Sequence, residues 1–429
     1  MKISITAATI AGALLASTSV HAADPAPAAS KSSFMEVISA SSNELNRALG
    51  GERDAVKRMD IQAKFDYSPA LRARLKAVFG NERPYPLVRS AGPKGQVIYT
   101  SKLMPHTYLD ANGAALSWSE LNSRSVANKA GSRIDTTLSL QSATVVGKAT
   151  AAMLENLSGD IKQVRGPGGI WYSNFSAKLG SLVIRTADAG GPDLKESVRL
   201  EDLAGRVNIE RRGKTVDVVY GLSVQSIAFG GDHVERANLG IRLANLPAQA
   251  MPDLETEITK VQGAGLTEDA QTQVLMKSML EFGKKMLKSG ASLVIDDISA
   301  SYRGNTASIK GRVDFDKVVD ADFKSPMEFV RKIVARFDVR LPVALVKDVC
   351  RVMVDKKVDR SNPDAAQLVE MATKDLAATT VGKLVNEGYA VMDKDELRSA
   401  IEFKNGEFTF NGKSIAVPGM PAPAAAPAP

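Results

Sequence analysis

The sequence holds little of the chemistry on which many enzymes depend. Its 429 residues include one cysteine and three histidines. One cysteine excludes an intramolecular disulfide framework and every multi-cysteine zinc or iron–sulfur site. Three histidines leave little material for metal sites or for acid–base catalysis by imidazole. We therefore expect no enzymatic activity, no cofactor and no metal, and the residues offer no catalytic set.

Neither sign of charge dominates the chain. Lys and Arg number 55 against 48 Asp and Glu, which gives a formal net charge of +7. This charge is modest for the length, so a nucleic-acid partner is not expected. Hydrophobic side chains make up 44% of the residues, ample for a sizeable core. At about 150 residues per domain, the length suggests two or three domains.

Long apolar runs are also missing. Residues 3–16 follow Lys2, are interrupted by hydroxyl side chains and are shorter than the ~20 apolar residues that span a bilayer. With the small side chains near Val20-His21-Ala22, they predict a secretory signal peptide at 1–22. We expect cleavage, export to the periplasm of a Gram-negative envelope, and no transmembrane helix in the mature chain. The alternative is an uncleaved anchor in the inner membrane.

The composition divides the rest of the chain. Residues 23–33 read as a flexible leader, and 417–429 as a disordered Pro/Ala tail that cannot form a hydrogen-bonded element. Between them we expect two parts of one folded body. Residues 34–245 form its β-rich N-terminal part, and residues 246–416 form its α+β C-terminal part.

The N-terminal part begins with helical spacing and then changes to a period of two. The spacing predicts helices over 34–49 and 68–80, the second with Ser68-Pro69 at its start and Gly80 at its end. From about 96 to 245 apolar and polar residues alternate, and Arg212-Gly213 reads as a hairpin turn. Many strands with short turns predict an antiparallel sheet with one wet face.

Helices intervene between strands past residue 246. The patterns predict helices at 267–288, from 325, at 342–357 and at 363–387, and strands at 293–298, 307–315, 337–341 and 397–403. The fold class is therefore α+β, a long twisted antiparallel β-sheet with helices inserted mainly in the C-terminal half. Two phrases, 199–203 and 242–246, share the pattern Arg-Leu-x-Asp/Asn-Leu and hint at one strand-ending device used twice.

Candidate metal ligands and phosphate loops fail on spacing. Gly213-Lys214-Thr215 and Gly412-Lys413-Ser414 lack the glycine five residues earlier that a P-loop needs, so hairpin turns are predicted there. Calcium loops need a glycine at the sharp turn and a terminal acid, and the acidic cluster near 314–322 has neither in register. The metal candidates we considered are His106 with Asp110; Asp232, His233 and Glu235; and Asp314, Asp316, Asp320 and Asp322.

Three further features have an ordinary and a functional interpretation. Cys350 shares an apolar stripe with Val346, Val349 and Met353, which indicates a core residue rather than a nucleophile. Methionines could line a lipid groove, although Met usually fills cores; these are Met276, Met279, Met286 and Met353. Residues 324–360 hold ten Lys and Arg against five acids and could touch anionic headgroups, although the wet face of amphipathic helices explains the same bias.

An ordered set of phrases resembles a known family. The set runs through 239–250, 286–298, 308–313, 337–342, Gly388-Tyr389 and 401–413. Its order and spacing resemble the YdgA-like bacterial envelope proteins, a family classed as a domain of unknown function (domain of unknown function 945). That family carries no established catalytic residues, so none can be transferred to this chain. The resemblance also implies an uncleaved N-terminal anchor, from which this leader departs. The family's long sheet is also similar in architecture to AsmA-type envelope proteins, which are implicated in lipid handling.

Three hypotheses for function follow. The first is an exported, non-enzymatic binding or scaffolding protein whose partner is an envelope lipid or another envelope protein. The second is a lipid-binding or lipid-handling protein, which requires an apolar concave face open to a ligand. The third is a hydrolase using carboxylates alone, which requires two acids converging in one cleft. The sequence leaves the oligomeric state open.

Overall fold

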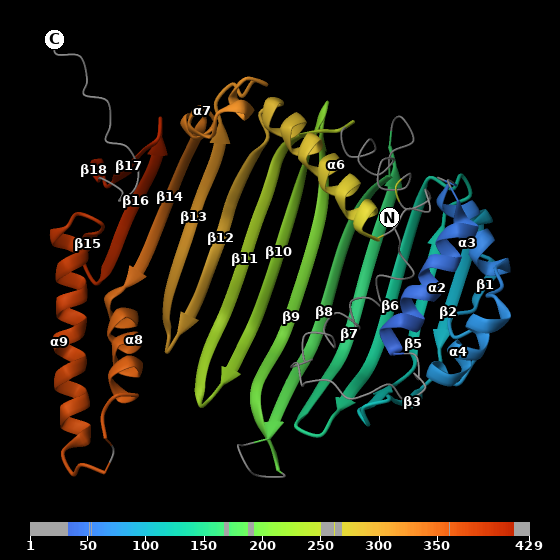
Figure 1. Ribbon diagram of the computed structural model, residues 1–429, viewed down its shortest axis with the longest axis horizontal. Helices are drawn as coiled ribbons and strands as arrows, with labels where there is room; N and C mark the ends of the chain where they lie inside the picture. The colour runs from blue at the N-terminus through green and yellow to red at the C-terminus, as the bar shows by residue number, and fades with distance from the viewer. Residues whose placement is uncertain are drawn as a thin grey trace. The chain divides into compact units, whose positions relative to one another are not determined.

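A computed structural model describes residues 33–50, 52, 54–166, 171–187, 193–249, 261, 268–359 and 361–415. These residues form a large antiparallel sheet of 18 strands and seven α-helices, three of them before the first strand and four in the C-terminal half (Figure 1). The predicted α+β class is confirmed. The predicted signal peptide at 1–22 and tail at 417–429 lie outside the described residues. None of the described helices combines the length and hydropathy needed to cross a membrane.

The chain divides into two compact units, which are described separately below. Unit 1 comprises Met1–Asn208, Val224–Asp232 and Ile258–Gln271. Unit 2 comprises Ile209–Ser223, His233–Glu257 and Thr272–Pro429. The predicted division of the body at residue 245 stays a prediction.

Unit 1 begins with three capped helices, α2 (Phe34–Leu49), α3 (Ala55–Lys64) and α4 (Pro69–Phe79). Ser33 and Glu36 form a capping box at α2, and Ser68 caps α4 ahead of its N-terminal proline. Gly80 ends α4 in the left-handed region at φ 72°, as its sequence position predicts. The helices α2 and α4 are thus confirmed, whereas α3 was not expected.

The strands of unit 1 pair in the order β1–β2–β5–β6–β7–β8–β9, and β4 continues the line of β5 along β6 while β3 pairs with β4. A 3₁₀ turn, Pro93–Gly95, joins the first two strands. The strands are β1 (Leu87–Ala91), β2 (Val97–Leu103), β3 (His106–Leu109), β4 (Ala115–Trp118), β5 (Leu121–Ala127), β6 (Arg133–Val146), β7 (Thr150–Arg165), β8 (Trp171–Ala187) and β9 (Leu194–Arg212), of which residues 209–212 belong to unit 2.

The core of unit 1 lies between α2 and α4 and one face of this sheet. Leu75 and Val37 are fully buried and meet strand residues such as Leu154. Phe34, Phe79 and Trp118 pack ring against ring, with centroids 5.5 to 6.1 Å apart. Such contacts add to the area that the large rings bury. One face of the sheet is therefore closed by helices.

A line of irregular residues crosses four neighbouring strands of unit 1, and we name it the crease. It consists of Gln141, Asn156, Gly180 and Asp202, which lie opposite one another where the regular pairing is interrupted. Asn156 and Asp202 have φ of 58° and 49°. A left-handed residue shifts the alternation of faces, so residues three apart can point the same way. Leu154 and Leu157 accordingly both reach the helical core.

The crease also explains the repeated phrases. Asp202 is the fourth residue of 199–203 and Asn245, with φ of 60°, is the fourth residue of 242–246. Residues 154–157 repeat the Leu-x-Asn-Leu pattern around Asn156. The expectation of a strand-ending device is corrected for Asp202, which lies inside β9. Asx side chains tolerate the left-handed region better than most, so the pattern marks a kink within a strand.

Unit 2 contains the sheet β11–β12–β13–β14–β16–β17–β18, with β15 also against β16. Its strands are β11 (Asp232–Pro247), β12 (Ser292–Tyr302), β13 (Asn305–Phe315), β14 (Ile333–Pro342), β15 (Val391–Asp393), β16 (Glu396–Lys404), β17 (Glu407–Phe410) and β18 (Lys413–Ile415), and it holds most of β10 (Thr215–Phe229). Its helices are α6 (Glu268–Lys288, in unit 2 from Thr272), α7 (Pro326–Arg331), α8 (Val343–Asp355) and α9 (Ala365–Asn386), with a 3₁₀ turn at Asp322–Lys324.

The core of unit 2 is small and lies at one end of its sheet. Val346 and Cys350 of α8 meet Ala377 of α9 and Leu397 of β16. The helices α8 and α9 lie side by side at this end (Figure 1). Cys350 is buried there and free, which confirms its interpretation as a core residue. At the other end of the sheet Phe329 of α7 stacks on Phe315, with ring centroids 6.0 Å apart.

Candidate functional site

Between these two ends, the middle of the unit 2 sheet presents a half-exposed apolar surface, which we name the open apolar face. Direct register partners build it in rows, for example Leu239, Ile298, Ile309 and Val339. Ile309 is 37% exposed. Its members are half-buried or, for Ile309, exposed: Leu239, Ile241, Leu243, Leu293, Ile295, Ile298, Ile309, Val313, Phe337, Val339 and Ile401.

The next row shows how closely the open apolar face is packed within its own layer. Ile241, Ile295, Gly311, Phe337 and Ile401 lie opposite one another on five strands. The ring of Phe337 lies against the α-carbon side of Gly311, where an added Cβ would collide with the ring and would sit 2.7 Å from the Arg336 carbonyl oxygen. An aromatic over a strand glycine restores the apolar surface that the glycine lacks.

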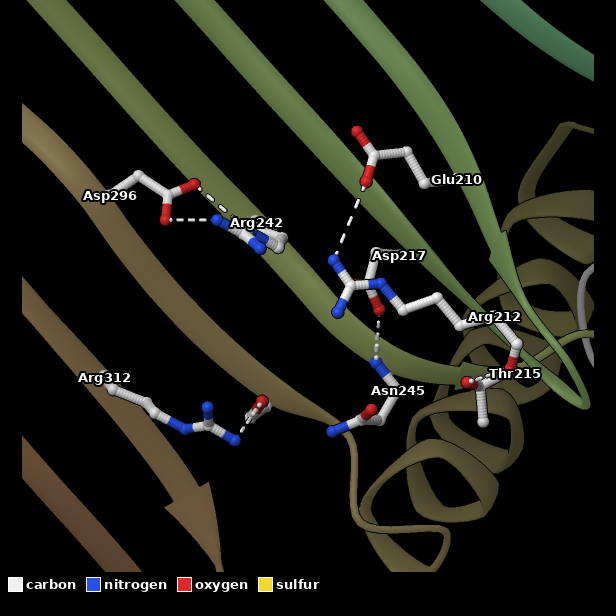
Figure 2. A network of polar contacts seen from close by, with 9 residues as sticks. Glu210, Arg212, Thr215, Asp217, Arg242, Asn245, Asp296 and Arg312 are labelled. Atoms are coloured by element: carbon white, nitrogen blue, oxygen red, sulfur yellow. Dashed lines mark hydrogen bonds and ion pairs between the residues drawn. The ribbon is translucent and has the colours of Figure 1, made fainter.

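The opposite face of the same strands carries ion pairs. Arg242 and Asp296 form a two-pronged pair with a shortest distance of 2.6 Å (Figure 2). Arg312 pairs with Asp314 at 2.8 Å, and Arg336 reaches Glu402 at 3.5 Å. The hydrogen bond from Arg242 to Asp296, then the charges of Asp296 and its neighbours, raise the pKa of Arg242. The middle of the sheet is thus apolar on one face and ionic on the other.

A buried carboxylate holds the adjoining hairpin. The Asp217 side chain is 2% exposed, accepts the backbone N–H of Asn245 at 2.9 Å and pairs with Arg212 Nε at 3.1 Å. Arg212 lies between this carboxylate and Glu210, which is 3.8 Å away (Figure 2). Because Asn245 is left-handed, its N–H turns from the regular ladder and the Asp217 oxygen supplies the partner. This network is structural, since each of its acids faces an arginine.

Unit 1 has a shallow polar hollow of about 530 Å³ at the crease, on the wet face of its sheet. Gln141 donates to Asn156 at 2.9 Å across it. Hydrogen bonds from Asn122 and Lys102 lower the pKa of Glu120 at its rim. Hydroxyl and amide groups dominate the lining: Ser119, Glu120, Asn122, Ser139, Leu140, Gln141, Asn156, Leu157 and Ser158. Neither aromatic rings nor a cluster of titratable groups lines it, so the hollow has little with which to bind or react strongly.

The candidate metal residues serve other roles. His106 packs on Trp118, with centroids 5.6 Å apart, while Asp110 accepts the N–H groups of its own turn. His233 lies 3.3 Å from Glu235 on an exposed strand. Among the described residues, no group of three or more His, Cys, Asp or Glu could hold a metal ion.

The acidic residues near 314–322 and the two glycine–lysine phrases also have structural roles. Asp314 pairs with Arg312, Asp320 pairs with Lys288 at 2.8 Å, and Asp322 accepts the N–H of Val319. The three carboxylates therefore have three different partners. The turns predicted at Gly213 and Gly412 are confirmed, because both glycines have positive φ between paired strands.

Two expectations about apolar side chains are wrong. Val349 and Met353 are 50% and 52% exposed, so they do not share the buried stripe of Cys350. Met276 and Met279 are 69% and 52% exposed and do not fill a core. The open apolar face itself was missed, although the alternation at 239–243, 293–298 and 337–341 was recognised. Alternation predicts which residues share a face but not whether a helix covers them.

Comparison with known protein families gives a match over most of the chain. A model of a bacterial protein family of unknown function, DUF945, matches residues 56–418. No curated protein and no solved structure matches the chain. The match covers more than four fifths of the sequence and agrees with the resemblance to the YdgA-like proteins. The chain therefore belongs to the DUF945 family of bacterial proteins.

Proposed function

We propose that the protein is an exported, non-enzymatic binding protein of the bacterial envelope, and that the open apolar face receives the acyl chains of an envelope lipid. The observation that carries the proposal is the half-exposed state of eleven apolar side chains on five neighbouring strands. Large contiguous apolar surfaces on soluble proteins mark interaction sites.

The chemistry of the surface suits a chain without polar groups. The strands satisfy their own backbone hydrogen bonds in the ladder, so a ligand on the open apolar face need supply none. Each methylene moved from water onto such a surface contributes about 0.8 kcal/mol. The ion pairs of the opposite face stay in water, which favours one apolar ligand surface per sheet.

Export rests on the sequence pattern of residues 1–22. We expect the mature protein to begin at Ala23 and to fractionate with the periplasm. Intact-mass measurement of the protein purified from its native envelope tests this directly. If the protein in the membrane fraction has a mass that includes residues 1–22, it is anchored and is not a soluble exported protein. If the protein is found in the cytosol, the proposed envelope role is wrong.

Lipid binding is tested by purifying the protein from its native envelope, extracting it and measuring bound lipid by mass spectrometry. Ile309→Gln should lower the lipid recovered several-fold, because it places an amide in the centre of the open apolar face. Lys310→Gln is the matched control, since the neighbouring side chain points to the ionic face. Equal recovery from both variants, or no lipid from the wild type, would contradict the proposal.

A photo-crosslinking amino acid at position 309 separates a lipid from a protein partner. A lipid on the open apolar face should give adducts of small added mass. Adducts of one defined envelope protein instead would show that the face is a scaffold surface, and the acyl-chain assignment would be wrong.

A further inference from the structure

The helix α6 has large apolar side chains that are exposed to solvent. Met276 is 69% exposed, Leu280 60% and Met279 52%. Met276 and Leu280 are four residues apart and so lie one above the other along one side of the helix. Leu275, Phe282 and Met286, on the adjacent side, are half-buried. The apolar arc of α6 is thus wide, with one part packed and one part facing solvent.

Lysines border the exposed part of this arc. Residues 272–288 contain Lys277, Lys284, Lys285 and Lys288 against one acid, Glu281. At 100° per residue, Lys277 and Lys284 fall beside the row of Met276 and Leu280. A broad apolar side next to a lysine-rich side is typical of helices that lie in the boundary between lipid headgroups and acyl chains.

The C-terminal end of α6 is fixed to unit 2. Lys288 binds Asp320 at 2.8 Å, and Lys284 Nζ lies 5.8 Å from the centre of the Phe323 ring. The hydrogen bond from Lys288 and its charge lower the pKa of Asp320, which keeps this contact ionic at neutral pH. The exposed methionines lie in the middle of the helix, on the N-terminal side of these contacts.

We infer that the Met276–Leu280 side of α6 docks the protein on an anionic lipid bilayer, with the apolar row in the headgroup boundary and the lysines on lipid phosphates. The positive charge of this part of α6 indicates which partner it binds. Although Glu268 and Asp269 lie at the start of α6, apposition of residues 272–288 of two copies would bring eight lysines together against two acids, so a second copy of this chain is a poor partner. An anionic surface attracts Lys277 and Lys285 directly, whereas Lys284 and Lys288 already pair with Glu281 and Asp320. This docking concerns a different surface from the open apolar face and stands without it.

The experiment is co-flotation of the full chain with lipid vesicles. Binding is expected to phosphatidylcholine vesicles containing phosphatidylglycerol, to weaken with salt, and to be much weaker on phosphatidylcholine alone. The double variant Met276→Gln with Leu280→Gln should lower partitioning about tenfold. Met371→Gln is the control, since this methionine is 58% exposed on α9. All substituted side chains are exposed, so an unchanged thermal melt is expected for each variant.

Two further measurements complete the test. Lys277→Gln should weaken binding to anionic vesicles about fivefold and leave binding to neutral vesicles unchanged. Ile309→Gln should retain flotation, so failure of lipid recovery and failure of docking are distinguishable. Equal flotation on neutral and anionic vesicles, unaltered binding by the double variant, or an α6-dependent dimer in solution would each overturn the inference.

Discussion

Units 1 and 2 are built from the same alternating strands but differ in what covers their apolar side. In unit 1 the strand residues Leu140, Leu154 and Trp118 are at most 9% exposed beneath α2 and α4. In unit 2 the corresponding strand residues, such as Ile295 and Phe337, stay half-exposed across the middle of the sheet. The difference teaches that alternation establishes a two-sided sheet, while the position of helices in the chain decides whether the apolar side is closed.

The polar sides differ as well. The wet face of unit 1 carries hydroxyl and amide groups around the crease, such as Ser139 and Ser158. The corresponding face of unit 2 carries arginine–carboxylate pairs across strands, such as Arg242 with Asp296. Exposed ion pairs contribute little stability each. Their placement opposite the apolar side instead favours one register, because a one-residue slip of a strand would move its charged side chains among the apolar ones.

The largest expected effect compares a core leucine with an open-face isoleucine. Leu75→Ala removes a fully buried side chain and should lower the free energy of unfolding by about 3 kcal/mol. Ile295→Ala removes a half-exposed one and should cost about 1 kcal/mol. Denaturant titration followed by tryptophan fluorescence reports unit 1, because both tryptophans lie there. Hydrogen exchange in β12 reports unit 2.

Equal losses in these two variants would break the comparison. They would mean that the open apolar face is covered in solution. Adding a detergent monomer should then leave the exchange rates of β12 unchanged, whereas an uncovered face should be protected by it.

The next effect concerns the buried carboxylate of unit 2. Asp217→Ala leaves the N–H of Asn245 without its oxygen, and Arg212 without its pair. We expect a loss of about 2 kcal/mol, measured by denaturant unfolding. Asp338→Ala is the matched control on an exposed strand position and should cost less than about 0.5 kcal/mol. A small loss at Asp217 would mean that hydration replaces its two partners.

The sequence predicted the helices and strands better than it predicted which faces of the sheet the helices cover. Alternation and caps predicted β13, β14 and α4, because both depend on residues close in sequence. The helix α3 was missed although Asp54 caps its start, and none of its ten residues is buried. The crease had a sequence signal in the Leu-x-Asn-Leu phrases, but its alignment across strands depends on pairing register. The open apolar face depends on where α8 and α9 pack, which no local pattern encodes.

A smaller effect separates two strand glycines. Gly311→Ala would drive its Cβ into the Phe337 ring and the Arg336 carbonyl, for a loss of about 1.5 kcal/mol. Gly159→Ala in unit 1 meets the Leu138 side chain, at 3.0 Å or more, which can move by a few tenths of an ångström. We expect that variant to cost less than half as much. Thermal melts of the two variants provide the measurement, and a reversed order would show that unit 2 accommodates strain more easily.

The smallest expected effect concerns one buried tyrosine of unit 1 and its titration at alkaline pH. Tyr99 is fully buried and donates to Asp60 at 2.8 Å, and burial together with this hydrogen bond raises the pKa of Tyr99 to about 12. The folded state therefore holds the phenol proton more tightly than the unfolded state, whose tyrosine pKa is about 10. This contribution is complete below pH 10 and is lost as the pH rises from about 10 through about 12.

Tyr99→Phe should cost about 1 kcal/mol at neutral pH, because the hydrogen bond is lost while Arg89 still pairs with Asp60 at 3.1 Å. Above pH 10 the variant should lose stability less steeply than the wild type, in urea titrations followed by fluorescence. Some slope should remain, since burial also raises the pKa of Tyr85. If Tyr99→Phe and the wild type lose stability equally steeply above pH 10, the alkaline loss of stability does not arise from Tyr99. The closed core of unit 1 would then not be the source of the pH dependence.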